Sequence, residues 1–290
     1  MRVTILFPSD YFDPTRVDEQ FQAEYAEVIK LPAFEVAFYN HDAFIEGKKL
    51  QIYPGINNGL CIARTWMLKP YEYLRLHNNL GQMDVRLINT PDEYSLMHLF
   101  PNIYPSIMNA TPRAMFFPDS ENVIAESINR TFKRFMIKDF VKSVKGYDFP
   151  ACIGTPVSQN ELDCYIKKFI ELRGGLFTGG IAIKEYVDLK QYGDCPNEYR
   201  VFYFDGHIIT ISRNSNQQVD ALYLPVDIAE TYAHLGSHYY TIDFGELACG
   251  GFTILETGDG QVSGLSPNQD IFKYYDGLRH IIEQERSDEY

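Results

Sequence analysis

The sequence has few cysteines that could form disulfides or bind a metal ion. Its five cysteines are odd in number and widely spaced, and no two of them form a C-x-x-C pair. This pattern indicates neither a disulfide framework nor a zinc site. We expect five small, mostly apolar side chains in a reducing compartment.

From the sequence we also expect no membrane-spanning segment and no leader peptide. No stretch approaches the roughly 20 apolar residues that cross a bilayer. The segment Met1–Asp10 has no basic region followed by an apolar core, as a secretory signal would. We therefore expect a cytoplasmic protein with no membrane partner.

Basic residues are scarce relative to acidic ones. Lys and Arg number 26 against 39 Asp and Glu, which gives a formal net charge of −13. A field of this sign repels a polyphosphate backbone, so nucleic acid is not expected as a partner. Local basic clusters can still hold a small anion.

The length and the apolar content predict a globular α/β and α+β protein of about two domains. The chain has 290 residues, 45% of them hydrophobic and 22% charged, which excludes global disorder. Strands and helices alternate before a loop rich in Pro and Asn at 101–118, which predicts an N-terminal α/β domain over residues 1–115. The expected strands are 2–7, 34–39, 60–64 and 85–88, and the expected helices are 18–30, 71–80 and 91–99, the last capped by Thr90.

Beyond the loop the pattern changes to a mainly antiparallel α+β domain over residues 116–290. A helix is expected from Ser120 to Thr131, and Asp205-Gly206 predicts a tight hairpin turn. The other expected strands are 135–140, 181–187, 199–204, 208–213, 239–244 and 252–256, and the other expected helices are 159–172 and 269–285.

Charged residues end several of these apolar strands, where charge is normally excluded unless it has a partner. They are Lys138, Lys184-Glu185, Arg200, Asp243 and Glu256. Three cations and several carboxylates on adjacent strands suit a nucleoside triphosphate with magnesium, because cations bind phosphates and hard oxygens bind the metal. The absence of histidine from this set favours magnesium over zinc.

A short basic loop follows the first of these strands. Lys142-Ser-Val-Lys-Gly146 combines cations with small residues that would let a loop close over phosphates. Neither G-x-x-x-x-G-K-[ST] nor G-x-G-x-x-G occurs in the chain, so the loop is not a Walker or dinucleotide-binding loop.

The ordered series of motifs resembles the ATP-grasp superfamily, and more narrowly its R-two-K clade. The motifs are Phe135-Met-Ile-Lys138, Ile183-Lys-Glu-Tyr-Val187, Glu198-Tyr-Arg-Val-Phe202, Asp243 and Leu255-Glu-Thr-Gly-Asp-Gly-Gln-Val-Ser-Gly-Leu265. Arg64-Thr-Trp-Met-Leu68 is similar to the clade's N-terminal region. The resemblance spans residues 60 to 267 and implies an ATP-grasp fold whose N-terminal part faces the acceptor.

The resemblance also implies a role for each matching residue. Lys138, Lys142, Lys184 and Glu198 would bind ATP, and Glu185, Tyr186 and Val187 would form the adenine-binding hinge. Arg200 and Arg64 would be catalytic, with Arg200 on the transferred phosphoryl group. Asp243 and Glu256 would hold Mg²⁺. Gly258 stands where many relatives have asparagine, so either Asp259 replaces that ligand or the second ion is held differently.

The resemblance predicts an ATP- and Mg²⁺-dependent ligase that joins a carboxylate to an amine through an acyl phosphate. The partners would be ATP and two acceptor substrates that the sequence does not identify. A nucleotide-binding sensor without catalysis and a phosphotransferase to a hydroxyl group remain as alternatives. For His98 we expect a hydrogen-bonded histidine that orders its loop, with general-base chemistry as the alternative.

Overall fold

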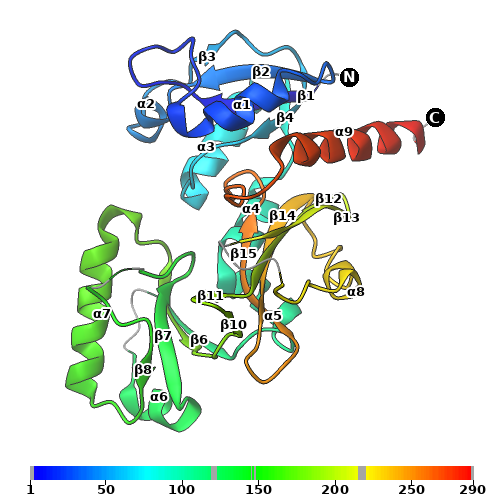
Figure 1. Ribbon diagram of the computed structural model, residues 1–290. Coiled ribbons are helices and arrows are strands. Elements are labelled where there is room, and N and C mark those ends of the chain that lie inside the picture. The colour runs from blue at the N-terminus through cyan, green and yellow to red at the C-terminus, as the bar shows by residue number, and fades with distance from the viewer. Residues whose placement is uncertain (1–2, 119–122, 145, 147, 215–219, 289–290) are drawn as a thin grey trace.

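The computed structural model describes residues 3–118, 123–144, 146, 148–214 and 220–288. Its strands form three larger sheets, with the N-terminal sheet above the other two (Figure 1). None of the helices in these residues is long and apolar enough to cross a membrane.

The N-terminal sheet is mainly parallel. Its central strand is buried along its whole length and pairs in parallel with a strand on each side, which explains its continuous apolar sequence. The strand order is β3 (Ile52–Tyr53), β2 (Phe34–Tyr39), β1 (Val3–Pro8), β4 (Gly59–Ala63) and β5 (Val85–Leu87), with β3 antiparallel to β2. The helical segments of this region are η1 (Glu19–Phe21), α1 (Gln22–Val28), α2 (His41–Ile45) and α3 (Pro70–Gly81).

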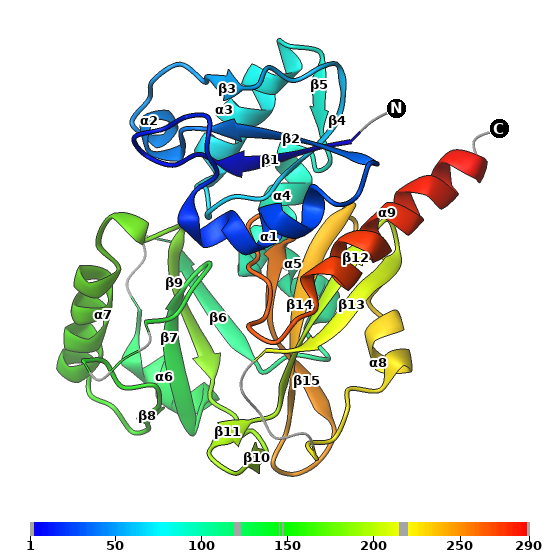
Figure 2. The same ribbon diagram turned by 45° about the horizontal axis from the view of Figure 1, so that its top comes forward.

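The other two larger sheets are antiparallel and lie beneath the first (Figure 2). The first has the order β6 (Ala114–Pro118), β9 (Gly180–Glu185), β7 (Arg134–Asp139) and β8 (Ile153–Gly154), with α6 (Ala125–Thr131), α7 (Gln159–Arg173) and η2 (Gly174–Leu176) beside it. The second has the order β13 (His207–Arg213), β12 (Glu198–Phe204), β14 (Tyr239–Glu246) and β15 (Phe252–Asp259), with α4 (Pro91–His98), α5 (Phe100–Ile107) and α8 (Val226–Glu230). A small ribbon, β10 (Gln191–Tyr192) with β11 (Cys195–Pro196), connects them.

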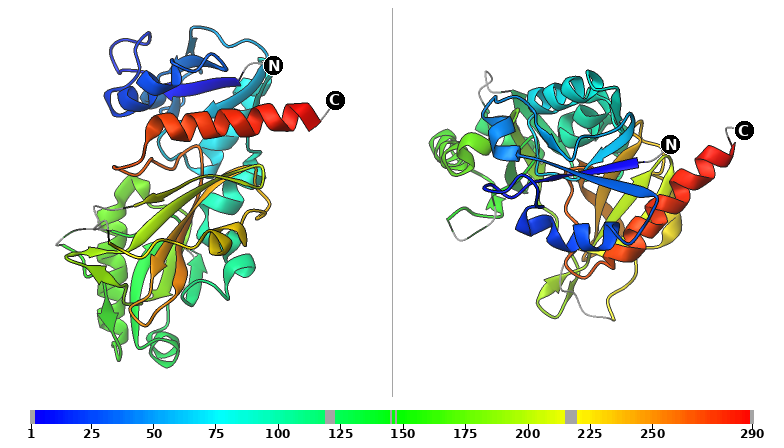
Figure 3. Two further views of the ribbon diagram at one scale, coloured as in Figure 1. Left: turned by 45° about the vertical axis from the view of Figure 1, so that its right-hand side comes forward. Right: turned by 90° about the horizontal axis from the view of Figure 1, so that it is seen from above.

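The last helix, α9 (Ile271–Asp288), returns to the N-terminal sheet (Figure 3). Tyr274, Tyr275 and Leu278 on this helix share one hydrophobic core with Val3 and Phe7 of β1. The two ends of the described chain are therefore packed together.

Most of the predicted elements are confirmed, and so is the α/β and α+β fold class. Thr90 caps α4 in a capping box with Glu93, whose carboxylate accepts from the Thr90 amide at 2.6 Å. Asp205 and Gly206 have φ values of 45° and 80°, as a two-residue hairpin turn requires.

The expected loop at 101–118 is wrong, because the chain there forms α5 and then β6. Pro101 lies in the first helical turn, where its missing N–H costs nothing, but Pro105 lies inside the helix. The helix forms because Phe100, Ile103 and Ile107 are buried along one face. Packing thus overrides two residues that normally signal a break.

Helix α6 begins at Ala125, and its N-cap residue Ile124 offers no side-chain cap, while Ser120 lies outside the described residues.

The division at 115/116 remains a proposal about domains. Helices α4 and α5 precede that position, yet they pack in one core with β12, β14 and β15.

Candidate active site

A cleft of about 570 Å³ lies between the two antiparallel sheets. This volume is in the range of small-molecule sites. All the predicted site residues line the cleft except Arg64 and Asp259: they are Lys138, Lys142, Lys184, Glu185, Tyr186, Val187, Glu198, Arg200, Asp243 and Glu256. The structure therefore brings together side chains from β7, β9, β12, β14 and β15.

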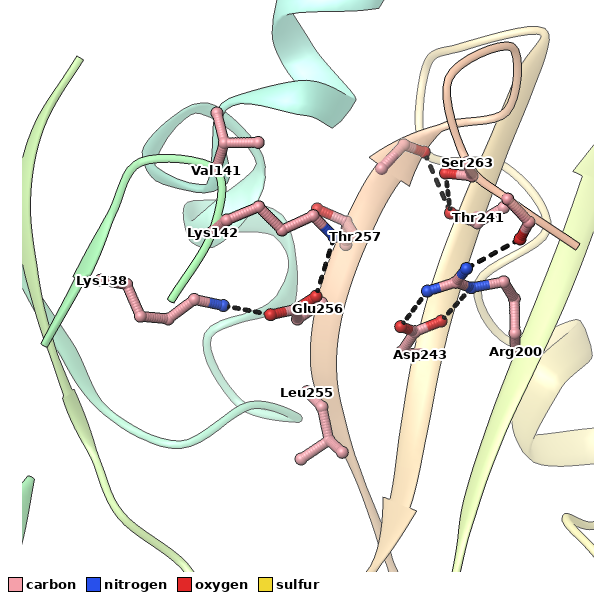
Figure 4. Close-up of polar contacts among 12 residues, drawn as sticks. Lys138, Val141, Lys142, Arg200, Thr241, Asp243, Leu255, Glu256, Thr257 and Ser263 are labelled. Atoms are coloured by element: carbon pink, nitrogen blue, oxygen red, sulfur yellow. Dashed lines mark hydrogen bonds and ion pairs between the residues drawn. The ribbon is translucent and has the colours of Figure 1, made fainter. Parts of the chain in front are cut away.

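Glu256 connects the two walls of the cleft (Figure 4). Its two carboxylate oxygens lie 2.5 Å from Lys138 Nζ and 3.4 Å from Lys142 Nζ. Lys138 is almost fully buried on β7, whereas Lys142 is partly exposed on the turn that follows. A buried ammonium needs such a partner, so the ion pair explains how a charged residue is tolerated at the end of an apolar strand.

Asp139, which the sequence analysis did not single out, fixes the turn that carries Lys142. Its fully buried carboxylate accepts hydrogen bonds from the backbone amides of Val141 and Lys142 at 2.7 and 2.6 Å. It also accepts one from Arg173 Nε at 2.8 Å. These bonds hold the turn against the end of α7.

Lys184 lies on β9 opposite Met136, and its ammonium is buried at the base of the cleft. Its Nζ donates to the carbonyl of Leu255 at 2.7 Å and lies 4.3 Å from the centre of the Phe100 ring. Burial, with the repulsion from Lys138, lowers the pKa of Lys184. Phe100 therefore gives the cation an aromatic partner that the sequence did not reveal.

Arg200, Asp243 and Glu256 lie opposite one another on three consecutive strands, which turns their side chains to one face of the sheet. Arg200 donates from Nε and Nη2 to the two oxygens of Asp243, both at 2.7 Å. Burial alone would lower the pKa of Arg200, but the Asp243 carboxylate raises it above its ordinary value. Asn214, at the end of β13, donates to the same carboxylate at 3.2 Å.

The predicted hinge leaves β9 at the mouth of the cleft. The Glu185 carboxylate pairs with Arg113 Nε and Nη2, both at 3.0 Å, and this hydrogen bonding lowers the pKa of Glu185. The amides of Glu185 and Tyr186 donate to the carbonyls of Arg113 and Arg134. Among the described residues, no backbone group bonds to the amide or carbonyl of Val187.

Arg64 and Asp259 do not line the cleft. Arg64 is buried and donates to both oxygens of Glu24 and to the carbonyls of Gly260 and Ser263. These contacts lie between the N-terminal sheet and the loop after β15. We therefore do not place Arg64 in the proposed catalytic set.

Asp259 is also fully buried at that interface. It accepts a 2.9 Å hydrogen bond from the Gln261 amide and a second bond from the side chain of Asn89. Burial raises its pKa to about 7. A carboxyl in this environment is a poor substitute for a metal ligand in the cleft, and we do not carry it into the proposed site.

At Gly258 a side chain would crowd two neighbouring hydroxyl groups. A Cβ at this position would lie 2.7 Å from Ser263 Oγ and 3.2 Å from Thr241 Oγ1. These two hydroxyls are hydrogen-bonded to each other at 2.8 Å (Figure 4). Among the described residues, the Asn214 amide instead lies 3.2 Å from the Asp243 carboxylate.

No group of three His, Cys, Asp or Glu side chains in the described part of the chain is arranged to hold a metal ion. Among the described residues, Asp243 and Glu256 offer hard oxygen ligands from directly opposed positions. A divalent cation here would need its remaining ligands from phosphate oxygens or water, as Mg²⁺ commonly has.

Residues 127–278 match the ATP-grasp domain, R2K clade family 3. The match covers more than half of the chain, so the chain belongs to this family. A search of curated proteins finds no match.

Comparison with solved structures gives the same fold over the whole chain. D-alanine–D-alanine ligase from Bacillus anthracis matches with a TM-score of 0.60 at 14% identity, covering 100% of both chains. A RimK domain protein ATP-grasp from Sphaerobacter thermophilus DSM 20745 matches with a TM-score of 0.61 at 12% identity, covering 97% of this chain and 99% of that one. The ATP-grasp ligase PsnB, complexed with minimal precursor, Mg and ADP, matches with a TM-score of 0.57 at 12% identity, covering 97% and 98%. The chain therefore has the ATP-grasp fold.

Proposed function

We propose that the chain is an ATP-dependent ligase that uses Mg²⁺ to join a carboxylate to an amine. The observation that carries the proposal is the opposed set of charges in the cleft. Lys138, Lys142 and Arg200 lie against Glu256 and Asp243, with contacts between 2.5 and 3.4 Å. Membership of the ATP-grasp family and the likeness of fold to ATP-grasp ligases support it.

The cations are the proposed contacts of the nucleotide phosphates. Phosphate oxygens would replace Glu256 on Lys138 and Lys142, with Lys184 below them, because each lysine can bind either anion. The amide and carbonyl of Val187, to which no described backbone group bonds, would receive the adenine edge beside Glu185 and Tyr186. Glu198, at the start of β12, is the remaining proposed nucleotide contact.

Asp243 and Glu256 are the proposed Mg²⁺ ligands, and Asn214 would add an amide oxygen. Hard carboxylate and amide oxygens fit this ion. When bound, Mg²⁺ neutralises charge on the phosphates and so makes nucleophilic attack on them easier. Arg200 would orient Asp243 and stabilise the negative charge that spreads over the transferred phosphoryl group.

The proposed reaction has two steps. A carboxylate oxygen of the first substrate attacks the γ-phosphorus, ADP leaves and an acyl phosphate forms. The amine of the second substrate then attacks the acyl carbon, loses a proton and expels inorganic phosphate. We propose that residues 1–115 contribute the acceptor side and residues 116–290 the nucleotide side.

Gly258 supports a second candidate, a nucleotide-binding protein without catalysis. Glycine replaces the asparagine common in relatives, and any side chain there would require the Ser263 hydroxyl to move, so the proposed metal site has one ligand fewer from β15. This candidate binds ATP and never releases ADP.

Mass spectrometry of ATP incubations with candidate acids and amines distinguishes the possibilities. The ligase predicts ADP, phosphate and a condensation product that has lost water and carries no phosphorus. A stable phosphorylated product would contradict the ligase in favour of a phosphotransferase. Nucleotide binding without ADP in any mixture would favour the sensor.

A further inference from the structure

A second cleft, of about 660 Å³, meets the first at the turn after β7. Val141 lines the second cleft, while the next residue, Lys142, lines the first. Figure 4 shows both on the same turn, with Lys142 reaching toward Glu256 and Val141 pointing away from it. The opposite walls come from the N-terminal region and from the end of α7 with η2. A molecule in this cleft would therefore lie next to the proposed phosphate site.

The walls of the second cleft are largely apolar. Trp66 lies in the wall, and its ring contacts Phe21 and His41 edge-on. Four large hydrophobic side chains in the lining are exposed to solvent: Met67, Ile45, Tyr71 and Leu176, the last 69% exposed. Exposed apolar side chains that gather around a concave surface are typical of a binding site.

His98 gives this apolar cleft a polar group at the junction. The imidazole is almost fully buried and stacks on Tyr94 at 4.7 Å. It makes no hydrogen bond to another described residue, contrary to the expectation from sequence. Burial, with the nearby Lys142 ammonium, lowers the pKa of His98 to about 3. The ring is therefore neutral at pH 7 and offers one N–H donor.

The charges around the junction favour an anion over an ammonium group. Lys142 lies on the nucleotide side, and Arg173 lines the second cleft, where its Nη2 also donates to the Leu176 carbonyl at 2.9 Å. The acidic side chains in the lining lie with the N-terminal region. Glu72 is bound there by the Lys69 amide at 2.7 Å and by the Tyr71 hydroxyl at 3.0 Å, while Glu46 pairs with Lys48 at 2.8 Å.

We infer that the second cleft binds the acyl donor, a carboxylic acid with a bulky apolar body such as an N-acylated leucine or a peptide ending in one. The carboxylate lies at the junction of His98 and Lys142, and the apolar body lies between Trp66 and Leu176. The inference rests on the proposed function, because the carboxylate is the group that must reach the γ-phosphate.

Trp66 gives a direct test, because it is the single tryptophan of the chain. Its emission is titrated with N-acetylleucine, with N-acetylleucinamide, which lacks the carboxylate, and with N-acetylglycine, which lacks the apolar side chain. ADP and Mg²⁺ are present throughout. We expect a saturable change with N-acetylleucine and binding at least tenfold weaker for the other two.

A matched pair of variants tests the location. Leu176→Glu places a charge in the apolar wall and should weaken N-acetylleucine at least tenfold. Leu172→Glu makes the same change at another exposed leucine, on α7 outside the cleft, and should leave binding unchanged. His98→Gln, which keeps an N–H donor, should retain more affinity than His98→Leu.

The inference is overturned if no probe saturates, if the amide binds as tightly as the acid, or if both leucine variants behave alike. A parallel thermal melt with ADP separates this failure from failure of the proposed function. An intact ADP shift with no probe binding rejects only the second cleft as the acyl-donor site. If ADP does not raise the Tm of the wild type, the result counts against the nucleotide site itself.

Discussion

Arg200 and Asp243 face each other across β12 and β14, and the guanidinium binds both carboxylate oxygens at 2.7 Å. A third donor, Arg200 Nη1, reaches the carbonyl of Gly264 at 2.8 Å. The planar fork thus connects a proposed metal ligand to the loop after β15. Only arginine can make these three contacts with one rigid group.

Replacement of Arg200 by lysine should therefore impair turnover although the charge is kept. Lysine loses the two-point contact with Asp243, and we expect kcat for ADP release to fall about 10- to 100-fold, which is roughly 1.4 to 2.8 kcal/mol. Arg279→Lys is the control, since Arg279 makes its ion pairs on the surface of α9. Equal rates in the two variants would contradict a role for Arg200 in the cleft.

Lys138→Ala should weaken ATP binding. A charge-assisted hydrogen bond contributes roughly 1.5 to 3 kcal/mol. Loss of the ammonium also removes a positive charge that offsets the repulsion between Glu256 and the phosphates. We expect a Kd for ATP about 10- to 100-fold higher by calorimetry. The control is Lys133→Ala, an exposed lysine outside the cleft. Unchanged affinity in Lys138→Ala would remove this residue from the proposed phosphate contacts.

Glu256→Gln should abolish ADP formation while the fold is retained. The amide keeps the size of the side chain, but it cannot supply the negative charge that a Mg²⁺ ligand needs. ADP release is measured against Mg²⁺ concentration, with circular dichroism as the check on folding. Full turnover at ordinary Mg²⁺ concentrations would exclude Glu256 as an essential ligand.

Asp259 should influence stability instead of metal binding. Burial raises its folded pKa to about 7 from an ordinary value of 3.8. The folded state therefore binds the proton more tightly, and the contribution of this group to the unfolding free energy falls as pH rises from about 4 to 7.

Denaturant unfolding of wild type and Asp259→Asn at pH 4.5 and 8 checks this effect. The unfolding free energy of Asp259→Asn, relative to that of the wild type, should be higher at pH 8 than at pH 4.5. The variant should also keep its Mg²⁺ dependence of ADP release. A loss of that dependence would restore Asp259 as a metal ligand.

Arg64→Ala should destabilise the interface between the N-terminal sheet and the loop after β15. Its removal leaves the Glu24 carboxylate buried without its main cationic partner, a change that typically costs about 3 to 5 kcal/mol. Unfolding in urea measures the loss, and Arg16→Ala, on the exposed loop after β1, is the control. A loss below roughly 1 kcal/mol would contradict the structural role assigned to Arg64.

The sequence revealed the charged residues of the cleft because each interrupts an apolar strand pattern. Lys138, Arg200, Asp243 and Glu256 contradict their local hydrophobic pattern, and such a conflict is visible without any tertiary information. Their shared location followed from the resemblance and from strand order. The antiparallel register of β14 and β15 places Asp243 opposite Glu256 in one wall of the cleft.

The burial of Arg64 and Asp259 was not visible in the same way. Both lie in motifs that carry other site residues, and only the packing of the N-terminal sheet on the loop after β15 removes them from the cleft. Phe100 was hidden for a related reason, since Pro101 and Pro105 indicate a loop where packing produces a helix. Long-range packing determines where these three residues lie, and local sequence patterns do not reveal such packing.

The most direct test of the central claim is a thermal melt of the wild type with a non-hydrolysable ATP analogue, with and without Mg²⁺. Ligand at a hundred times its Kd adds about 2.7 kcal/mol to the unfolding free energy. We predict a clear rise in Tm that is larger with Mg²⁺ and is much smaller when Lys138 is replaced by alanine. An unchanged Tm at saturating analogue, with and without Mg²⁺, would contradict the account.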